Sequence, residues 1–165
     1  MQLNDTSAFA EIYMRYKRAV YEYCYRLLQN RQVAEDATQN TFMKIHHSIG
    51  ELRSAASFKS WMFRIARNEV YAHLRRARSN GLEAGEDVWE VESPHDEFVH
   101  QEQSELVQRL LAELKPEYRE VLLLVEYEQL SYADIASITN ATLSSVESRI
   151  FKARKALAKK LKPYL

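Results

Sequence analysis

Apolar residues recur at intervals of three and four positions along most of this chain, with little to interrupt them. In residues 5–30, for example, Phe9, Tyr16, Val20 and Tyr23 fall on one side of a helix at about 100° per residue. Glycine occurs only 3 times in the sequence, and no Asn-Gly turn links two segments of alternating hydrophobicity. The sequence therefore predicts an all-α protein.

Helical periodicity gathers in two parts of the chain. Gly50 favours an end to the second stretch of the first part, and Pro116 fits the first turn of the helix that it opens. The stretches are residues 5–30, 32–50 and 57–79 in the first part, and residues 104–114, 116–130 and 131–162 in the second.

Charge separates these two parts. Residues 1–80 hold 13 Lys/Arg and 7 Asp/Glu, residues 81–108 hold 9 Asp/Glu and no Lys/Arg, and residues 109–165 hold 10 Lys/Arg and 7 Asp/Glu. Basic blocks suggest a polyanionic partner, which the acidic segment would repel or imitate. We interpret residues 79–103 as an acidic flexible linker, because the stretch has no helical period. The expected domains are residues 1–78 and 104–165.

Several classes of protein are disfavoured by what the sequence lacks. The aliphatic run from Val121 to Val125 is too short to span a membrane, and no secretory signal pattern opens the chain. The single cysteine, Cys24, cannot form an internal disulfide and reads as a small core residue. Without zinc-ligand spacing among the histidines, a phosphate-binding loop or a nucleophile elbow, we expect no enzyme, no metal and no cofactor. We expect a cytoplasmic protein.

The stretch at residues 57–79 has two distinct faces. Met62, Ala66 and Val70 belong to an ordinary core stripe. The other face carries aromatic rings, which stack on unpaired bases at roughly 1–3 kcal/mol each, and cations, which follow phosphates. The alternative is that Trp61 packs on a neighbouring helix while the arginines are merely solvated. The residues of this face are Trp61, Arg64, Asn68, Tyr71 and Arg75.

The last stretch predicts a helix-turn-helix. Ser131 followed by Asp134 is a variant of the capping box, Asn140 tolerates a left-handed turn, and Thr142 can cap the next helix. Hydrogen-bond donors line the outward face of that second helix, which suits contact with duplex DNA. A solvated surface on a helical bundle remains the alternative. The donors are Ser145, Ser148, Arg149, Lys152 and Lys155.

Three segments, in this order, resemble the hallmarks of a bacterial sigma factor of the extracytoplasmic-function (group IV, ECF) type of the sigma-70 family. They are "AEDATQNTFMKI", "FKSWMFRIARN" with "HLRR", and "LSYADIASITNATLSSVESRIFKARKAL". The resemblance covers nearly the whole chain apart from the acidic segment. It implies a subunit that directs core RNA polymerase to promoters and assists melting of the −10 element, with a domain two-like bundle followed by a domain four-like helix-turn-helix.

The resemblance also assigns residues to partners. For core polymerase it implies Asp36, Gln39 and Phe42, although Phe42 could instead be a core residue with the polar pair solvated. For the single-stranded −10 element it implies Trp61, Arg64, Asn68, Tyr71, Arg75 and Arg76, with the loop "GELRSAAS" beside them. For the −35 element it implies Ser145, Glu147, Ser148, Arg149 and Lys152.

Some positions depart from the family pattern. Glu147 stands where a basic residue is common, and it could accept a hydrogen bond from cytosine N4 or tune the neighbouring Arg149. Asn140 and Ser144 replace common glycines, and Asn40 replaces a usual acid. These departures leave the exact −35 sequence open.

The expected partners are core RNA polymerase, promoter DNA and an anti-sigma factor. We expect no membrane insertion, and a monomer when the protein is free. The alternative function is a stand-alone helix-turn-helix transcriptional regulator that binds duplex DNA as a dimer. That alternative explains residues 131–162 but assigns no role to the Trp61 face.

Overall fold

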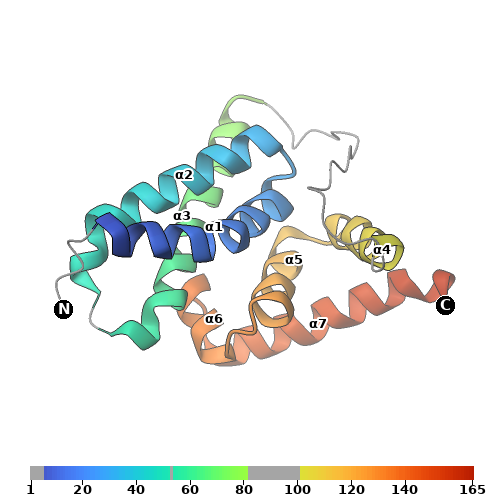
Figure 1. Ribbon diagram of the computed structural model, residues 1–165. Coiled ribbons are helices and arrows are strands. Elements are labelled where there is room, and N and C mark those ends of the chain that lie inside the picture. Colours follow the sequence, from blue (N-terminus) through green and yellow to red (C-terminus); the bar gives the residue numbers. More distant parts are fainter. Residues whose placement is uncertain (1–5, 53, 82–100) are drawn as a thin grey trace.

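The protein forms two helical bundles that pack against each other (Figure 1). The computed structural model describes residues 6–52, 54–81 and 101–165, and every regular element in these ranges is a helix. The predicted all-α class is therefore confirmed. The predicted linker, residues 79–103, lies mostly outside the described residues.

The first bundle consists of three long helices. Helix α2 begins after Asn30, whose side chain accepts a hydrogen bond of 3.0 Å from the Val33 amide. The second helix ends at Ser48 rather than at Gly50, because the chain tightens there into a short 3₁₀ turn. The elements are α1 (Thr6–Leu28), α2 (Arg31–Ser48), η1 (Ile49–Glu51), η2 (Ala55–Ser57) and α3 (Phe58–Ser79).

The core of this bundle follows the predicted stripes. Val20, Met62, Ala66 and Val70 are fully buried. Cys24 is also buried, and burial raises the pKa of its thiol to about 12. A thiol with that pKa stays protonated at neutral pH, so Cys24 is a core residue, as the sequence indicated.

The second bundle contains the predicted helix-turn-helix. Pro116 opens α5, as expected, but the long helix predicted for residues 116–130 changes form after Leu122. It continues as a single π-helical turn, in which the Glu128 amide bonds to the Leu123 carbonyl at 3.2 Å. The elements are α4 (Gln101–Ala112), α5 (Pro116–Leu122), η3 (Leu123–Tyr127), α6 (Tyr132–Thr139), α7 (Leu143–Leu161) and η4 (Lys162–Tyr164).

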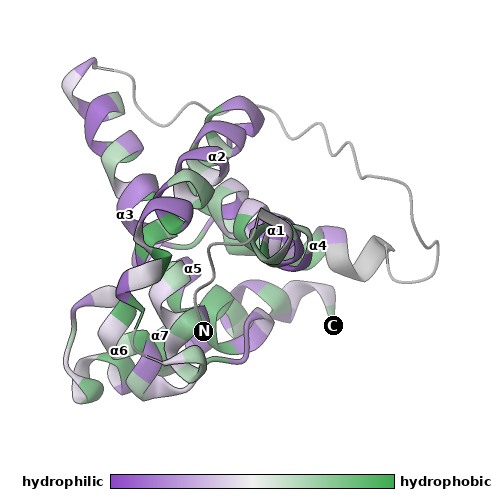
Figure 2. Cartoon of the chain, turned by 60° about the vertical axis from the view of Figure 1, so that its left-hand side comes forward, coloured by the Kyte–Doolittle hydropathy of each residue, from purple (hydrophilic) through white to green (hydrophobic). Residues whose placement is uncertain are grey.

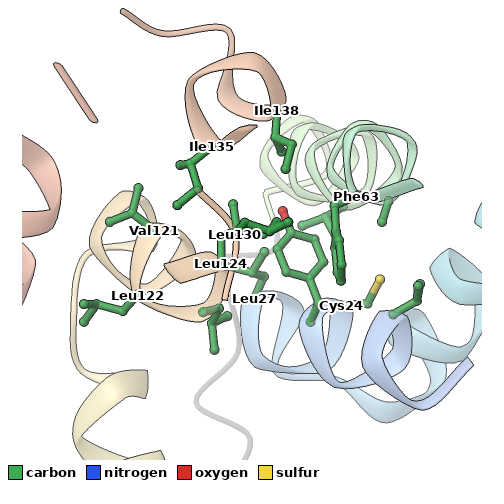
Figure 3. Packing of buried hydrophobic residues seen from close by; sticks show 14 of the residues in the cluster. Cys24, Leu27, Phe63, Val121, Leu122, Leu124, Leu130, Ile135 and Ile138 are labelled. Atoms are coloured by element: carbon green, nitrogen blue, oxygen red, sulfur yellow. The ribbon is translucent and has the colours of Figure 1, made fainter. Parts of the chain in front are cut away.

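A single hydrophobic core runs through both bundles. Figure 3 shows side chains of α1 and α3 facing those of the second bundle, with Leu27 and Phe63 on one side and Leu124, Leu130 and Ile138 on the other. The two domains predicted from the sequence are thus held together in this structure. Their contact places the predicted −10 face of α3 beside α5 and α6.

Candidate functional site

The helix-turn-helix is built by three local hydrogen-bonding devices. Ser131 Oγ accepts from the Asp134 amide at 3.1 Å and opens α6. Asn140 ends α6 in the left-handed conformation, with φ 52° and ψ 43°. Thr142 Oγ1 then accepts from the Ser145 amide at 3.1 Å and opens α7. All three devices were predicted from the sequence, and they set where the two helices begin and where α6 ends.

Burial of one side of α7 turns the opposite side outward. Val146, Ile150 and Ala153 are buried against the bundle. Five residues were predicted to contact the −35 element, and we call them the reader residues. Glu147, Ser148 and Lys152 are exposed, whereas Ser145 and Arg149 are half-buried. The Arg149 guanidinium donates to Ser145 Oγ at 3.5 Å, which holds it along the helix surface.

The sequence reasoning missed one exposed aromatic residue on this helix. Phe151 is 68% exposed and lies on α7 near the reader residues, outside the buried stripe. Its position one residue after Ile150 could have revealed this, because adjacent residues on a helix point about 100° apart. An exposed ring beside hydrogen-bond donors can contact a thymine methyl group.

The predicted polymerase-docking residues on α2 separate into two groups. Asp36 and Gln39 are exposed, as a docking surface requires. Phe42 is only 3% exposed, and its ring packs edge-on against Tyr13, with the ring centroids 5.0 Å apart. Of the two readings that the sequence left open for Phe42, the structure places its ring in the core.

Exposed apolar side chains also occur on α2 and on the neighbouring helix α1. Met43, one turn beyond Gln39 on the same helix, is 53% exposed, and on α1 Tyr13 and Met14 are 41% and 64% exposed. None of these three residues was among those that the sequence assigned to a partner. The acid and the amide together with these apolar side chains form what we call the α2 surface: Tyr13, Met14, Asp36, Gln39 and Met43.

The predicted −10 face of α3 changes in character along the helix. Trp61 is half-buried, and its ring is tilted against Phe58 at a centroid distance of 6.0 Å. Arg64 and Asn68 are exposed, as are Arg75 and Arg76. The C-terminal end of α3, which carries Arg75 and Arg76, is hydrophilic and stands clear of the second bundle (Figure 2).

The middle of the same face meets the second bundle. Arg64 donates to Ser137 Oγ of α6, and Tyr71 donates from its hydroxyl to Glu120 Oε2 of α5 at 2.7 Å. Burial, together with the charge of Glu120, raises the pKa of Tyr71 to about 12. An open cleft of about 700 Å³ lies between the bundles here, lined by polar groups that include Arg64, Asn68 and Asn140.

The described residues give no sign of a membrane span or a metal centre. None of their helices is both long enough and apolar enough to cross a bilayer. No three His, Cys, Asp or Glu side chains in these ranges group together as metal ligands would.

Comparison with known proteins identifies relatives along nearly the whole chain. Residues 12–80 match the family model "Sigma-70 region 2", and residues 104–157 match "Sigma-70, region 4". RNA polymerase sigma-H factor of Pseudomonas aeruginosa is 30% identical, with 100% of this chain and 92% of the relative covered. ECF RNA polymerase sigma factor SigW of Bacillus subtilis is 32% identical, with 96% of this chain and 91% of the relative covered.

Two solved structures share the fold. The sigma factor RpoE of Bartonella quintana, in complex with the anti-sigma factor NepR, superposes with a TM-score of 0.79 at 26% identity, over 93% of this chain and 96% of that one. CnrH, in complex with the cytosolic domain of CnrY, superposes with a TM-score of 0.70 at 22% identity, over 97% of this chain and 91% of that one.

Proposed function

This chain belongs to the sigma-70 family as an ECF-type RNA polymerase sigma factor. We propose that three of its surfaces bind three different partners during transcription initiation: core polymerase, the −10 strand and the −35 element. Sigma factors are not enzymes, so this work is binding and positioning. The observation that supports the proposal best is the order of the two sigma-70 regions, the second of which ends in a fully capped helix-turn-helix. We divide the chain into residues 1–78, a linker at 79–103, and residues 104–165.

The α2 surface binds core RNA polymerase. Asp36 and Gln39 supply a carboxylate and an amide, while Tyr13, Met14 and Met43 supply apolar contact area at its edge. An apolar cluster with polar neighbours is the usual composition of a protein–protein hot spot. Phe42 does not touch the partner. Its buried ring supports this surface by packing against Tyr13.

The α3 face binds the unpaired −10 strand. Trp61 offers a ring for stacking, Asn68 offers hydrogen bonds to base edges, and Arg75 and Arg76 offer charge for the neighbouring phosphates. These two arginines lie on the end of α3 that stands clear of the second bundle. The face therefore has an accessible phosphate-binding C-terminal end, and its base-binding residues lie in the first half of the helix.

The outward side of α7 reads the −35 element in the major groove. Replacing Arg149 with alanine is expected to lower −35-dependent promoter selection by about tenfold, because one good base contact is worth about 1–3 kcal/mol. The measurement is transcription from paired templates with an intact and a scrambled −35 element. Arg154→Ala is a matched control on the same helix, since Arg154 pairs with Glu126 of its own bundle. Unchanged selectivity in Arg149→Ala would remove Arg149 from the reading set.

The remaining proposals concern partners and location. We propose that an anti-sigma factor binds this protein, as NepR binds the relative from Bartonella quintana. We propose further that the protein acts in the cytoplasm, where core polymerase and promoter DNA are found, and that it is a monomer when free. It needs no cofactor for these tasks.

The direct test is co-elution with purified bacterial core RNA polymerase on a sizing column, followed by promoter-specific transcription. The variant Asp36→Ala with Met43→Ala should weaken co-elution by about tenfold, because it removes two hot-spot side chains while leaving Phe42 in the core. Glu35→Ala is the control, since Glu35 is an exposed acid at the preceding position of α2. Direct binding to duplex DNA without any association with core would favour a stand-alone regulator instead.

A further inference from the structure

We propose that α7 carries a second DNA-binding surface beyond the reader residues, formed by three exposed lysines along its C-terminal half. We call Lys155, Lys159 and Lys162 the lysine row. Its ligand is the sugar–phosphate backbone of duplex DNA beside the −35 element. The proposal rests on the proposed function of α7, and it adds a surface that holds the duplex without reading its bases.

The lysine row lies on the outward side of the helix and continues from the reader residue Lys152. Steps of three, four and three residues separate these four lysines, so they share one helical face. All four are exposed, whereas Ala153 on the opposite side is buried. The row therefore begins within one turn of the residues that are proposed to contact the −35 element.

The end of the chain that carries the row is strongly basic. Residues 148–165 hold 7 Lys/Arg and no Asp/Glu. Two of these cations turn back to acids of the second bundle: Arg154 Nη2 lies 2.6 Å from Glu126 Oε1, and Lys160 Nζ lies 2.9 Å from Glu113 Oε2. Within the described residues, the lysine row has no carboxylate partner of this kind. The protein itself neutralises the paired cations, and the lysine row is left to an external anion.

The helix dipole accounts for only part of this charge. Cations stabilise the C-terminal end of a helix, but the effect falls off within the last turn. Lys159 lies in that turn, whereas Lys155 lies more than one turn before the end of α7 at Leu161. A merely solvated helix face commonly alternates charges of both signs, and this face carries one sign only. The single sign and the alignment with the reader residues favour an anionic ligand.

The length of α7 brings the lysine row to the edge of the major groove. The second helix of a helix-turn-helix places its N-terminal residues against base edges. The 19 residues of α7 span about 28 Å at about 1.5 Å per residue, whereas the major groove is about 12 Å wide. Figure 1 shows α7 along one edge of the second bundle as far as the C-terminus. Its later outward residues therefore extend past the bases and face the backbone that borders the groove.

Lysine chemistry suits a contact with this backbone. The ammonium is a compact charge on a flexible four-carbon stem, so it follows phosphates without a fixed register. Phosphate contacts position a protein on DNA but carry no sequence information directly. Each neutralised phosphate also releases counterions, so affinity falls as salt rises, with a slope of about 0.9 per contact on logarithmic axes. The lysine row accordingly sets the salt dependence of promoter binding and leaves the choice of −35 sequence to the reader residues.

The test compares two double variants of the full-length chain, each assembled with core RNA polymerase. Lys155→Gln with Lys159→Gln removes two charges from the lysine row. Arg154→Gln with Lys160→Gln is the matched control, which removes two charges that are paired within the bundle. Glutamine retains the helix propensity of α7. The probe is a duplex that carries the −35 element between flanks of about 15 base pairs, since about 50 Å of DNA at about 3.4 Å per base pair exceeds the length of α7.

The lysine-row variant should show a salt slope that is smaller by about 2 than that of the wild type, because about 0.9 is lost with each phosphate contact. Between about 50 and 200 mM salt, its affinity should therefore fall about tenfold less. The control should keep the wild-type slope. Fluorescence anisotropy measures these affinities. The preference for an intact over a scrambled −35 element should stay within about twofold of wild type, because phosphates do not report the sequence.

Three results would overturn the proposal. One is an unchanged salt slope in the lysine-row variant, and another is a changed preference for the intact element, which would make these lysines base readers. The third is weaker assembly with core at an unchanged salt slope, which would assign the row to an acidic protein surface. Arg149→Ala on the same duplexes tests the proposed function separately. If it leaves the −35 preference unchanged, the reading role of α7 falls; if it lowers that preference while the lysine-row variant keeps the wild-type slope, only the lysine row falls.

Discussion

Replacing Trp61 and Arg64 together with alanine is expected to slow open-complex formation by about 100-fold, since stacking is worth about 1–3 kcal/mol per base and a cation adds to it. The unpaired −10 strand must be held strongly enough to offset an unpairing cost of a few kcal/mol. Trp61 is the half-buried ring at the start of the α3 face, and Arg64 is the exposed cation one turn later. Their loss removes contacts that form only after the duplex has opened.

The same double variant should bind core polymerase within about threefold of wild type, because the α2 surface is unchanged. Open complexes are measured by permanganate footprinting at saturating holoenzyme, and holoenzyme assembly by co-elution. The Arg64→Ala change also removes a bond to Ser137 of α6, so saturating holoenzyme is needed to exclude any effect of the contact between the two bundles. Arg18→Ala, an exposed arginine on α1, is the control. Equal loss of assembly and opening would mean that Trp61 serves only as a core residue.

Local chemistry made the helix-turn-helix predictable. Ser131, Asn140 and Thr142 each act on residues within a few positions of themselves, through a cap or a left-handed turn. Such devices need no knowledge of the rest of the chain, so they can be recognised in a sequence. The buried stripe of α3 was predictable for the same reason, because Met62, Ala66 and Val70 share one face of one helix.

Contacts between distant segments were not predictable in this way. Glu120 meets Tyr23 and Tyr71 across 97 and 49 positions, and nothing near Glu120 in the sequence marks it as buried. The α2 surface was only partly predicted. Helical spacing already sets Met43 on the side of Asp36 and Gln39, opposite the buried stripe. Phe42 lies at the edge of that stripe, and its burial depends on packing against Tyr13 of α1.

Arg119 is another residue whose role depends on distant packing. Its guanidinium is buried and donates to three carbonyls at the end of α4 and just beyond it: Leu111 at 3.0 Å, Ala112 at 2.7 Å and Leu114 at 2.9 Å. A fourth bond of 3.1 Å reaches the Arg26 carbonyl of α1. Burial lowers the pKa of the Arg119 guanidinium, but the group stays charged at any pH at which the protein folds.

Arg119→Met should therefore lower the free energy of unfolding by about 3 kcal/mol, because it leaves helix-end carbonyls buried without donors. Denaturant unfolding followed by circular dichroism measures this loss. Arg109→Met, an exposed change on α4, should stay within about 0.5 kcal/mol of wild type. A loss below about 1 kcal/mol in Arg119→Met would mean that water replaces the guanidinium at those carbonyls.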